Sequence, residues 1–122
     1  MRRTVTVILA AALVLPASGV AIAKPTINVD PSSVHAGKRV RVFGSAGGCP
    51  TGDAVTLISR AFSHKHEFAG VPAITAVVRS SSRYSVRTRI PRQRTPARYR
   101  ITGRCGGGNF GVVRRLRVLA SV

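Results

Sequence analysis

The sequence has 122 residues, of which 20 are Lys or Arg, 3 are Asp or Glu and 2 are Cys, so its formal net charge is +17. This length predicts a single domain, and a hydrophobic content of 44% excludes a chain that its charge keeps disordered. The three carboxylates, Asp30, Asp53 and Glu67, are too few for most acid–base catalysis.

Residues 1–23 are predicted to be a cleaved signal peptide. Two arginines precede an apolar run over 5–15, and Ala-Ile-Ala at 21–23 supplies the small-x-small pattern that signal peptidase recognises. The alternative is an uncleaved membrane anchor, because 5–23 is nearly long enough to span a bilayer. Cleavage leaves a domain over 24–122 with 18 basic and 3 acidic residues. We expect this domain to be secreted or associated with the cell envelope.

The rest of the chain is predicted to be all-β, because apolar and polar residues alternate between groups of turn residues. In chain order, strands are predicted over 26–29, 38–43, 54–59, 74–79, 83–90, 98–102 and 115–118. They are separated by turn residues at 30–33 and 36–37, a Gly-rich loop at 44–52, a hairpin turn at 80–82, a basic connection at 91–96 and a Gly-rich turn at 105–109. Seven strands with this spacing predict two antiparallel sheets packed face to face.

The alternation breaks at the beginning of the last strand. Val112 and Val113 are adjacent, and Arg114 falls on the face that Leu116 and Val118 use. A β-bulge near Val113 would restore the phase.

Cys49 and Cys105 are predicted to form a disulfide, because two cysteines allow one pairing and an exported chain meets an oxidising environment. The loop between them is long, so the chain-entropy model gives a stabilisation of about 4 kcal/mol. The sandwich would bring the two Gly-rich loops that hold these cysteines to one end.

Several segments resemble secreted bacterial immunoglobulin-like domains, especially actinobacterial ones. They are Ile-Asn-Val-Asp-Pro-Ser at 27–32, Cys-Pro-x-Gly-Asp-x-Val-Thr-Leu at 49–57 and Pro-Ala-Arg-Tyr-Arg-Ile-Thr-Gly-Arg-Cys-Gly-Gly at 96–107. The resemblance covers essentially all of 24–122 and implies a seven-stranded immunoglobulin-like sandwich rather than a particular activity. Apoproteins of the neocarzinostatin type share this architecture. They suggest an alternative function, a small-molecule or metal carrier that uses loops at one end of the sandwich.

No residues form a recognisable catalytic or cofactor site. The serines lie in turns, and the glycines at 106–108 precede a predicted strand instead of the helix that a phosphate-binding loop needs. His35, His64 and His66 could share the end opposite the disulfide and bind zinc or copper. Basic neighbours such as Lys65 would repel a cation, so we predict no metal ligands. Because no catalytic set is recognisable, we also predict no cofactor and no enzymatic activity.

Arginine is the most informative residue type. Alternation directs four arginines outward from each predicted sheet: Arg39, Arg41, Arg87 and Arg89 from one, and Arg98, Arg100, Arg115 and Arg117 from the other. With so few carboxylates, these rows predict electrostatic association with an anionic cell-envelope polymer, a lipid surface, nucleic acid or an acidic protein. The alternative interpretation is a solvated face that only keeps the protein soluble.

Overall fold

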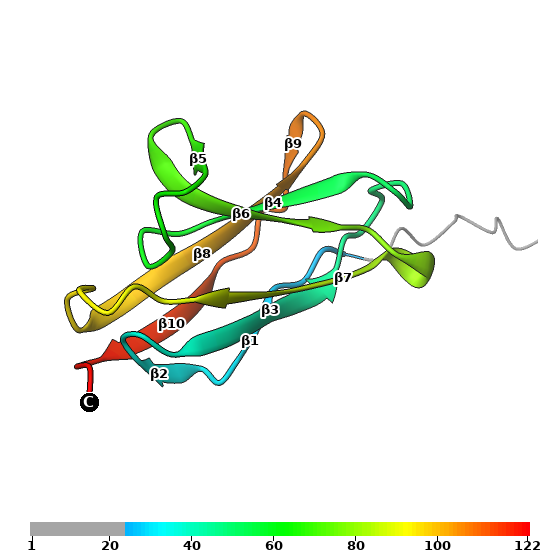
Figure 1. The fold of residues 1–122 in the computed structure, drawn as a ribbon. Helices are drawn as coiled ribbons and strands as arrows, with labels where there is room; N and C mark the ends of the chain where they lie inside the picture. The colour runs from blue at the N-terminus through cyan, green and yellow to red at the C-terminus, as the bar shows by residue number, and fades with distance from the viewer. Residues whose placement is uncertain (1–23) are drawn as a thin grey trace, which may run out of the picture.

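The computed structural model describes residues 24–122, which form strands and connections in an all-β fold (Figure 1). The elements in chain order are β1 (Asn28–Asp30), β2 (Ser33–His35), β3 (Arg39–Ser45), β4 (Ala54–Ile58), β5 (Glu67–Phe68), β6 (Val71–Val77), the 3-10 turn η1 (Ser80–Ser82), β7 (Arg83–Arg89), β8 (Ala97–Cys105), β9 (Gly108–Asn109) and β10 (Arg114–Leu119). The predicted signal peptide lies outside the described residues. Within 24–122, no helix has the length and apolar character needed to cross a membrane.

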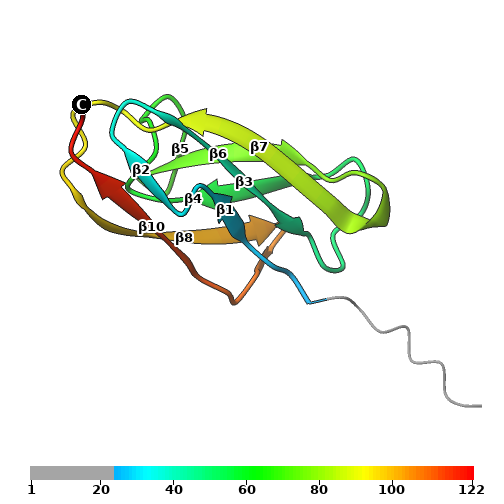
Figure 2. The same cartoon turned by 90° about the horizontal axis from the view of Figure 1, so that it is seen from below.

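The strands pair into two sheets. One has the order β1-β3-β7, and the other has the order β2-β10-β8-β4-β6-β5, with β9 paired to β8. Neighbouring strands are antiparallel except β2, which runs parallel to β10. Figure 2 shows β7 and β8 on opposite sides of the molecule.

The all-β prediction is confirmed, and each of the seven predicted strands overlaps an observed one: β1, β3, β4, β6, β7, β8 and β10. The structure adds the short strands β2, β5 and β9. The predicted turn at 30–33 therefore needs correction at Ser33, where β2 begins, and β2 fills the gap before the turn residues at 36–37. Val34 is buried while Ser33 and His35 are exposed, and three residues are too few for this alternation to be distinguished from a turn.

The prediction of a hairpin at 80–82 is also wrong in part. A tight turn is present, and an isolated bridge joins Arg79 to Arg83. However, β6 pairs with β4 and β5, whereas β7 pairs with β3 in the other sheet. The turn therefore carries the chain from one sheet to the other, which lets Val78 and Tyr84 on either side of it both enter the core.

The predicted bulge near Val113 is absent from the described strands, because β10 begins only at Arg114. The inward phase of Arg114 has a different explanation. Its Nε donates to the carbonyl oxygen of Ile27 at 2.9 Å, and its Nη2 donates to Oδ1 of Asn28 at 3.1 Å. Arg114 thus connects β10 to the N-terminal segment that leads into β1.

A single hydrophobic core lies between the sheets and receives side chains from both. Fully buried members are Val40, Val42 and Tyr84 from the first sheet and Val55, Leu57, Ile101, Leu116 and Val118 from the second. They alternate with exposed or half-buried residues along their strands, as the two-residue period predicts. The outward positions therefore point away from this core on each sheet.

Tyr84 anchors the beginning of the domain to the core. Its side chain is 2% exposed, and its hydroxyl donates to the carbonyl oxygen of Thr26 at 2.7 Å. Burial raises the pKa of the Tyr84 hydroxyl above its usual range.

We expect the protein to lose stability in alkali through Tyr84. An unfolded tyrosine loses its proton near pH 10, whereas the buried hydroxyl keeps it to higher pH, so ionisation favours the unfolded chain as pH rises through that value. Urea unfolding measured as pH rises above about 10 should show a smaller decline in the free energy of unfolding for Tyr84→Phe than for the wild type. The variant also loses the hydrogen bond to Thr26, which lowers its stability at every pH. Equal declines in the two proteins would contradict the assignment.

Candidate functional site

The outward side of β3 and β7 carries the first group of arginines. The register places Arg39 opposite Arg89 and Arg41 opposite Arg87, and all four side chains are exposed. Arg83, at the start of β7, has the same outward phase and is also exposed. These five arginines are called the β3–β7 face.

The outward side of β8 and β10 carries the second group. Arg98 lies opposite Arg117, and Arg100 lies opposite Arg115, again with all four side chains exposed. Arg104 has the same phase farther along β8. These five arginines are called the β8–β10 face. Sequence reasoning had omitted Arg83 and Arg104, although the period of two could have found both.

The cross-strand neighbours on both faces are therefore like charges. Residues directly opposite in an antiparallel pair have Cβ atoms about 4.5–5.5 Å apart, and like charges at that separation destabilise the pair. No carboxylate forms an ion pair with these arginines: among residues 24–122, the one ion pair joins His64 Nδ1 to Glu67 Oε1 at 3.0 Å. Asp30 lies opposite Arg41 in the β1–β3 pairing without forming an ion pair. An anion bound on either face would relieve the repulsion in the two arginine pairs of that face.

One aromatic ring accompanies each face. The guanidinium carbon of Arg41 lies 4.1 Å from the centre of the Phe43 ring, and that of Arg104 lies 4.7 Å from the centre of the Phe68 ring. A cation–π contact orients a guanidinium without cancelling its charge. Phe43 has the same outward phase as Arg41 and could have been found from the sequence. Phe68 comes from β5, so only the tertiary structure brings it to Arg104.

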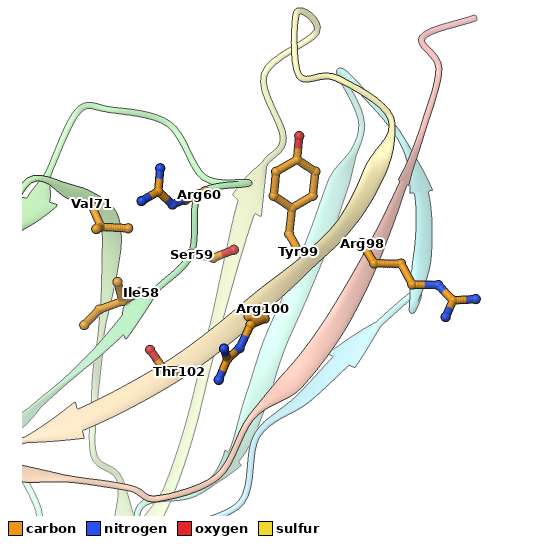
Figure 3. Close-up of a pocket in the computed structure, with 8 residues that line it drawn as sticks. All are labelled: Ile58, Ser59, Arg60, Val71, Arg98, Tyr99, Arg100 and Thr102. Atoms are coloured by element: carbon orange, nitrogen blue, oxygen red, sulfur yellow. The ribbon is translucent and has the colours of Figure 1, made fainter.

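A hollow of about 300 Å³ opens beside the β8–β10 face (Figure 3). The β4–β8 pairing ends at Ile58 and Thr102, and the chain after β4 then turns away from β8. The hollow is lined by Ile58, Ser59, Arg60, Val71, Arg98, Tyr99, Arg100 and Thr102. Figure 3 shows Arg60 and Arg100 on two sides of it, with Arg98 directed away. Arg60 was not among the predicted site residues, because nothing in the local pattern distinguishes it.

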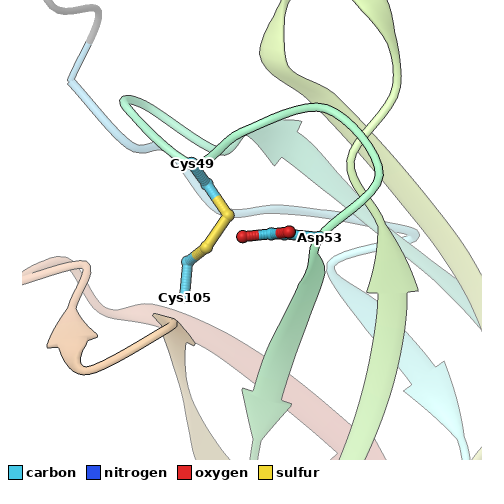
Figure 4. A group of neighbouring side chains, drawn as sticks. All are labelled: Cys49, Asp53 and Cys105. Atoms are coloured by element: carbon cyan, nitrogen blue, oxygen red, sulfur yellow. A yellow bond between two sulfur atoms is a disulfide. The ribbon is translucent and has the colours of Figure 1, made fainter.

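The predicted disulfide is confirmed, with the Cα atoms of Cys49 and Cys105 6.0 Å apart. It joins the two Gly-rich loops at one end of the molecule, and β9 pairs back on β8 just beyond Cys105. A carboxylate oxygen of Asp53 lies within 4.8 Å of both sulfur atoms (Figure 4). Because the two sulfurs are bonded to each other, they offer no thiolate to a metal ion.

The histidines that suggested a metal carrier are not brought together. His35 Nδ1 donates to the carbonyl oxygen of Ala120 at 2.8 Å, and His64 Nδ1 donates to Glu67. Within 24–122, the group with three possible ligands close together is Cys49, Asp53 and Cys105. The described chain therefore contains no preformed site built from His35, His64 and His66.

Comparison with known proteins identifies no family for the chain. No family model and no curated protein matches the sequence. Among solved structures, the chain is similar to an alkylpurine DNA glycosylase of Pseudomonas fluorescens, bound to DNA that contains an abasic-site analogue. The TM-score is 0.49 at 18% identity, and the match covers 80% of this chain and 31% of that chain. A match at this level carries no inference about function.

Proposed function

We propose that the protein is an exported, non-enzymatic immunoglobulin-like domain that binds an anionic partner through its arginine faces. Candidate partners are a cell-envelope polymer, a lipid surface and nucleic acid. The four directly opposed arginine pairs carry this proposal, because they concentrate positive charge on adjacent strands without carboxylate partners. A face needed only for solubility gains nothing from like charges placed directly opposite each other.

Three features support an immunoglobulin-like architecture. The first segment of the domain is divided between the sheets, with β1 on β3 and β2 parallel to β10. The disulfide links the loop after β3 to the end of β8, one strand from each sheet. Near the start of β8, the Tyr99 hydroxyl donates to the carbonyl oxygen of Thr95 at 2.6 Å. This backward bond resembles that of the tyrosine corner of immunoglobulin-like domains, although Tyr99 lies six residues before Cys105 instead of two.

Export is supported by the pattern over 1–23 and by the disulfide. A bridge of this kind persists in oxidising compartments and is rare in the cytosol. In a wall or an extracellular matrix, an uncompensated positive surface would meet anionic polymers at high local concentration.

Salt-dependent binding tests the proposed function, with duplex DNA as the probe polyanion. Displaced counterions make the logarithm of the affinity fall linearly with the logarithm of salt concentration. The slope should be about −4 to −5 if about five charges are engaged. Arg87→Glu/Arg89→Glu should weaken binding and flatten the slope while preserving the fold, because both side chains face solvent.

The matched control is Lys24→Glu/Arg92→Glu, which makes the same charge change at exposed positions outside the two faces. It should alter affinity much less than the reversal at Arg87 and Arg89. An affinity that is equal at low and physiological salt would refute the proposal. So would an affinity unchanged by Arg87→Glu/Arg89→Glu and by the corresponding reversal at Arg98 and Arg100.

The hollow beside β8 favours a second candidate function, the carriage of a small anion that has an apolar part. Arg60 and Arg100 flank it, and Ile58 and Val71 supply apolar surface. Its volume of about 300 Å³ is at the lower limit of small-molecule sites. Ligand binding that Arg60→Ala abolishes and Arg87→Glu/Arg89→Glu leaves intact would distinguish this function from polyanion binding.

A further inference from the structure

The two arginine faces point in opposite directions from the core. Val40 and Val42 of β3 share one hydrophobic cluster with Leu116 and Val118 of β10. The arginines of each face alternate with these inward residues, so both groups project away from the same core on its two sides. Figure 2 shows the corresponding strands β7 and β8 on opposite sides of the molecule.

Each face has what a separate site for a linear polyanion requires. Both carry two directly opposed arginine pairs, a fifth arginine and one guanidinium held over an aromatic ring. Strands rise about 3.3 Å per residue, so the two pairs of a face follow each other at about 6.6 Å along the strands. The charge thus forms a narrow row two strands wide, a shape that suits a chain lying along it.

One stiff segment cannot occupy both faces. A domain of about 100 residues has a radius of gyration of about 13 Å, whereas duplex DNA stays nearly straight over about 150 base pairs. A duplex lying on one face cannot bend around the domain, so the opposite face stays available to another duplex.

We infer that the protein is a bridge that holds two segments of a stiff linear polyanion of the duplex nucleic acid type, one on the β3–β7 face and one on the β8–β10 face. This inference rests on the proposed function, and it adds that the two faces act as independent sites. A carboxylate adjoins only the β3–β7 face, because Asp30 lies in a hollow with Arg39, Arg41 and Arg87. The other two carboxylates lie elsewhere, Asp53 beside the disulfide and Glu67 on His64. The β8–β10 face should therefore bind first and more tightly.

The test uses two populations of short duplex DNA, one labelled with a fluorescence donor and the other with an acceptor. The wild type should bring donor and acceptor together at low salt, and added salt should abolish the signal. Arg87→Gln/Arg89→Gln and Arg98→Gln/Arg100→Gln each weaken one face. Each variant should still bind single duplexes, but its energy transfer should be at least tenfold lower than that of the wild type. The control Lys24→Gln/Arg92→Gln, at exposed positions outside both faces, should retain the energy transfer.

The outcomes separate the bridge from simple binding. Wild-type protein that binds duplexes without bringing them together would overturn the bridge and leave the proposed function intact, whereas no binding at all would overturn both. Energy transfer that persists in both single-face variants would also overturn the bridge, because self-association of the protein would then explain it. The Gln variants remove like-charge contacts at exposed positions, so a melting temperature equal to or above that of the wild type verifies that they fold.

Discussion

Replacing both Cys49 and Cys105 by Ser is expected to lower the free energy of unfolding by about 4 kcal/mol. The bridge spans 56 residues, and closing a loop of that length removes much of the conformational entropy of the unfolded chain. Domains of this size have total stabilities of about 5–15 kcal/mol, so the loss would be a large share of the total. The bridge lies apart from the four opposed arginine pairs and adjoins only Arg104 of the β8–β10 face, so polyanion affinity under native conditions should change little.

Urea unfolding of the wild type and the double variant measures this difference. The wild type treated with reductant is the matched control, since it loses the same covalent bond with no change of side chain beyond reduction. It should unfold at nearly the same urea concentration as the double variant. Two free thiols in the native exported protein, titrated under denaturant, would contradict the expectation.

Gly44→Ala is expected to cost about 3 kcal/mol, at the upper end for overpacking substitutions. A Cβ at position 44 would overlap the carbonyl oxygen of Thr26 and lie 2.9 Å from its carbonyl carbon. Thr26 cannot withdraw easily: its N–H donates to the carbonyl oxygen of Ser45, its Oγ1 accepts from the Ser45 N–H, and its carbonyl accepts from Tyr84. Relief of the overlap would break these bonds and loosen β1 from β3.

Gly107→Ala is the matched control for this substitution. A Cβ there would meet nothing within 4 Å, so the same added methyl group should leave stability nearly unchanged. Chemical denaturation of the two variants gives the comparison. Equal stability of Gly44→Ala and Gly107→Ala would show that the approach of Thr26 to position 44 does not constrain the fold.

The arginine pairs and the disulfide act on stability in opposite directions. A cross-strand pair is worth roughly 0.2–1 kcal/mol, and its sign is unfavourable for like charges. The disulfide offsets a penalty of this size, and a bound polyanion would stabilise the folded state further because it binds that state preferentially. A charged surface that destabilises the free protein and is relieved by a ligand fits a binding role better than a solubility role.

Local sequence determined seven of the ten strands in residues 24–122 and the directions of most of their side chains. The two-residue period is a property of the extended backbone itself, so Val40 and Val42 could be directed inward and Arg39 and Arg41 outward without knowledge of any partner strand. The disulfide could also be predicted from the sequence, since two cysteines allow a single pairing.

Only the tertiary structure decided which residues meet. Register depends on pairing between strands distant in the chain, so alternation could not reveal that Arg41 faces Arg87 or that Arg100 faces Arg115. The guanidinium of Arg114 donates to Ile27, which is distant in sequence, and nothing in the local pattern indicates this bond. The inward position of Arg114 was therefore attributed wrongly to a bulge. For the same reason, the contact of Arg104 with Phe68 could not be predicted: sequence patterns carry the geometry of one strand, and these contacts depend on how separate strands are placed in space.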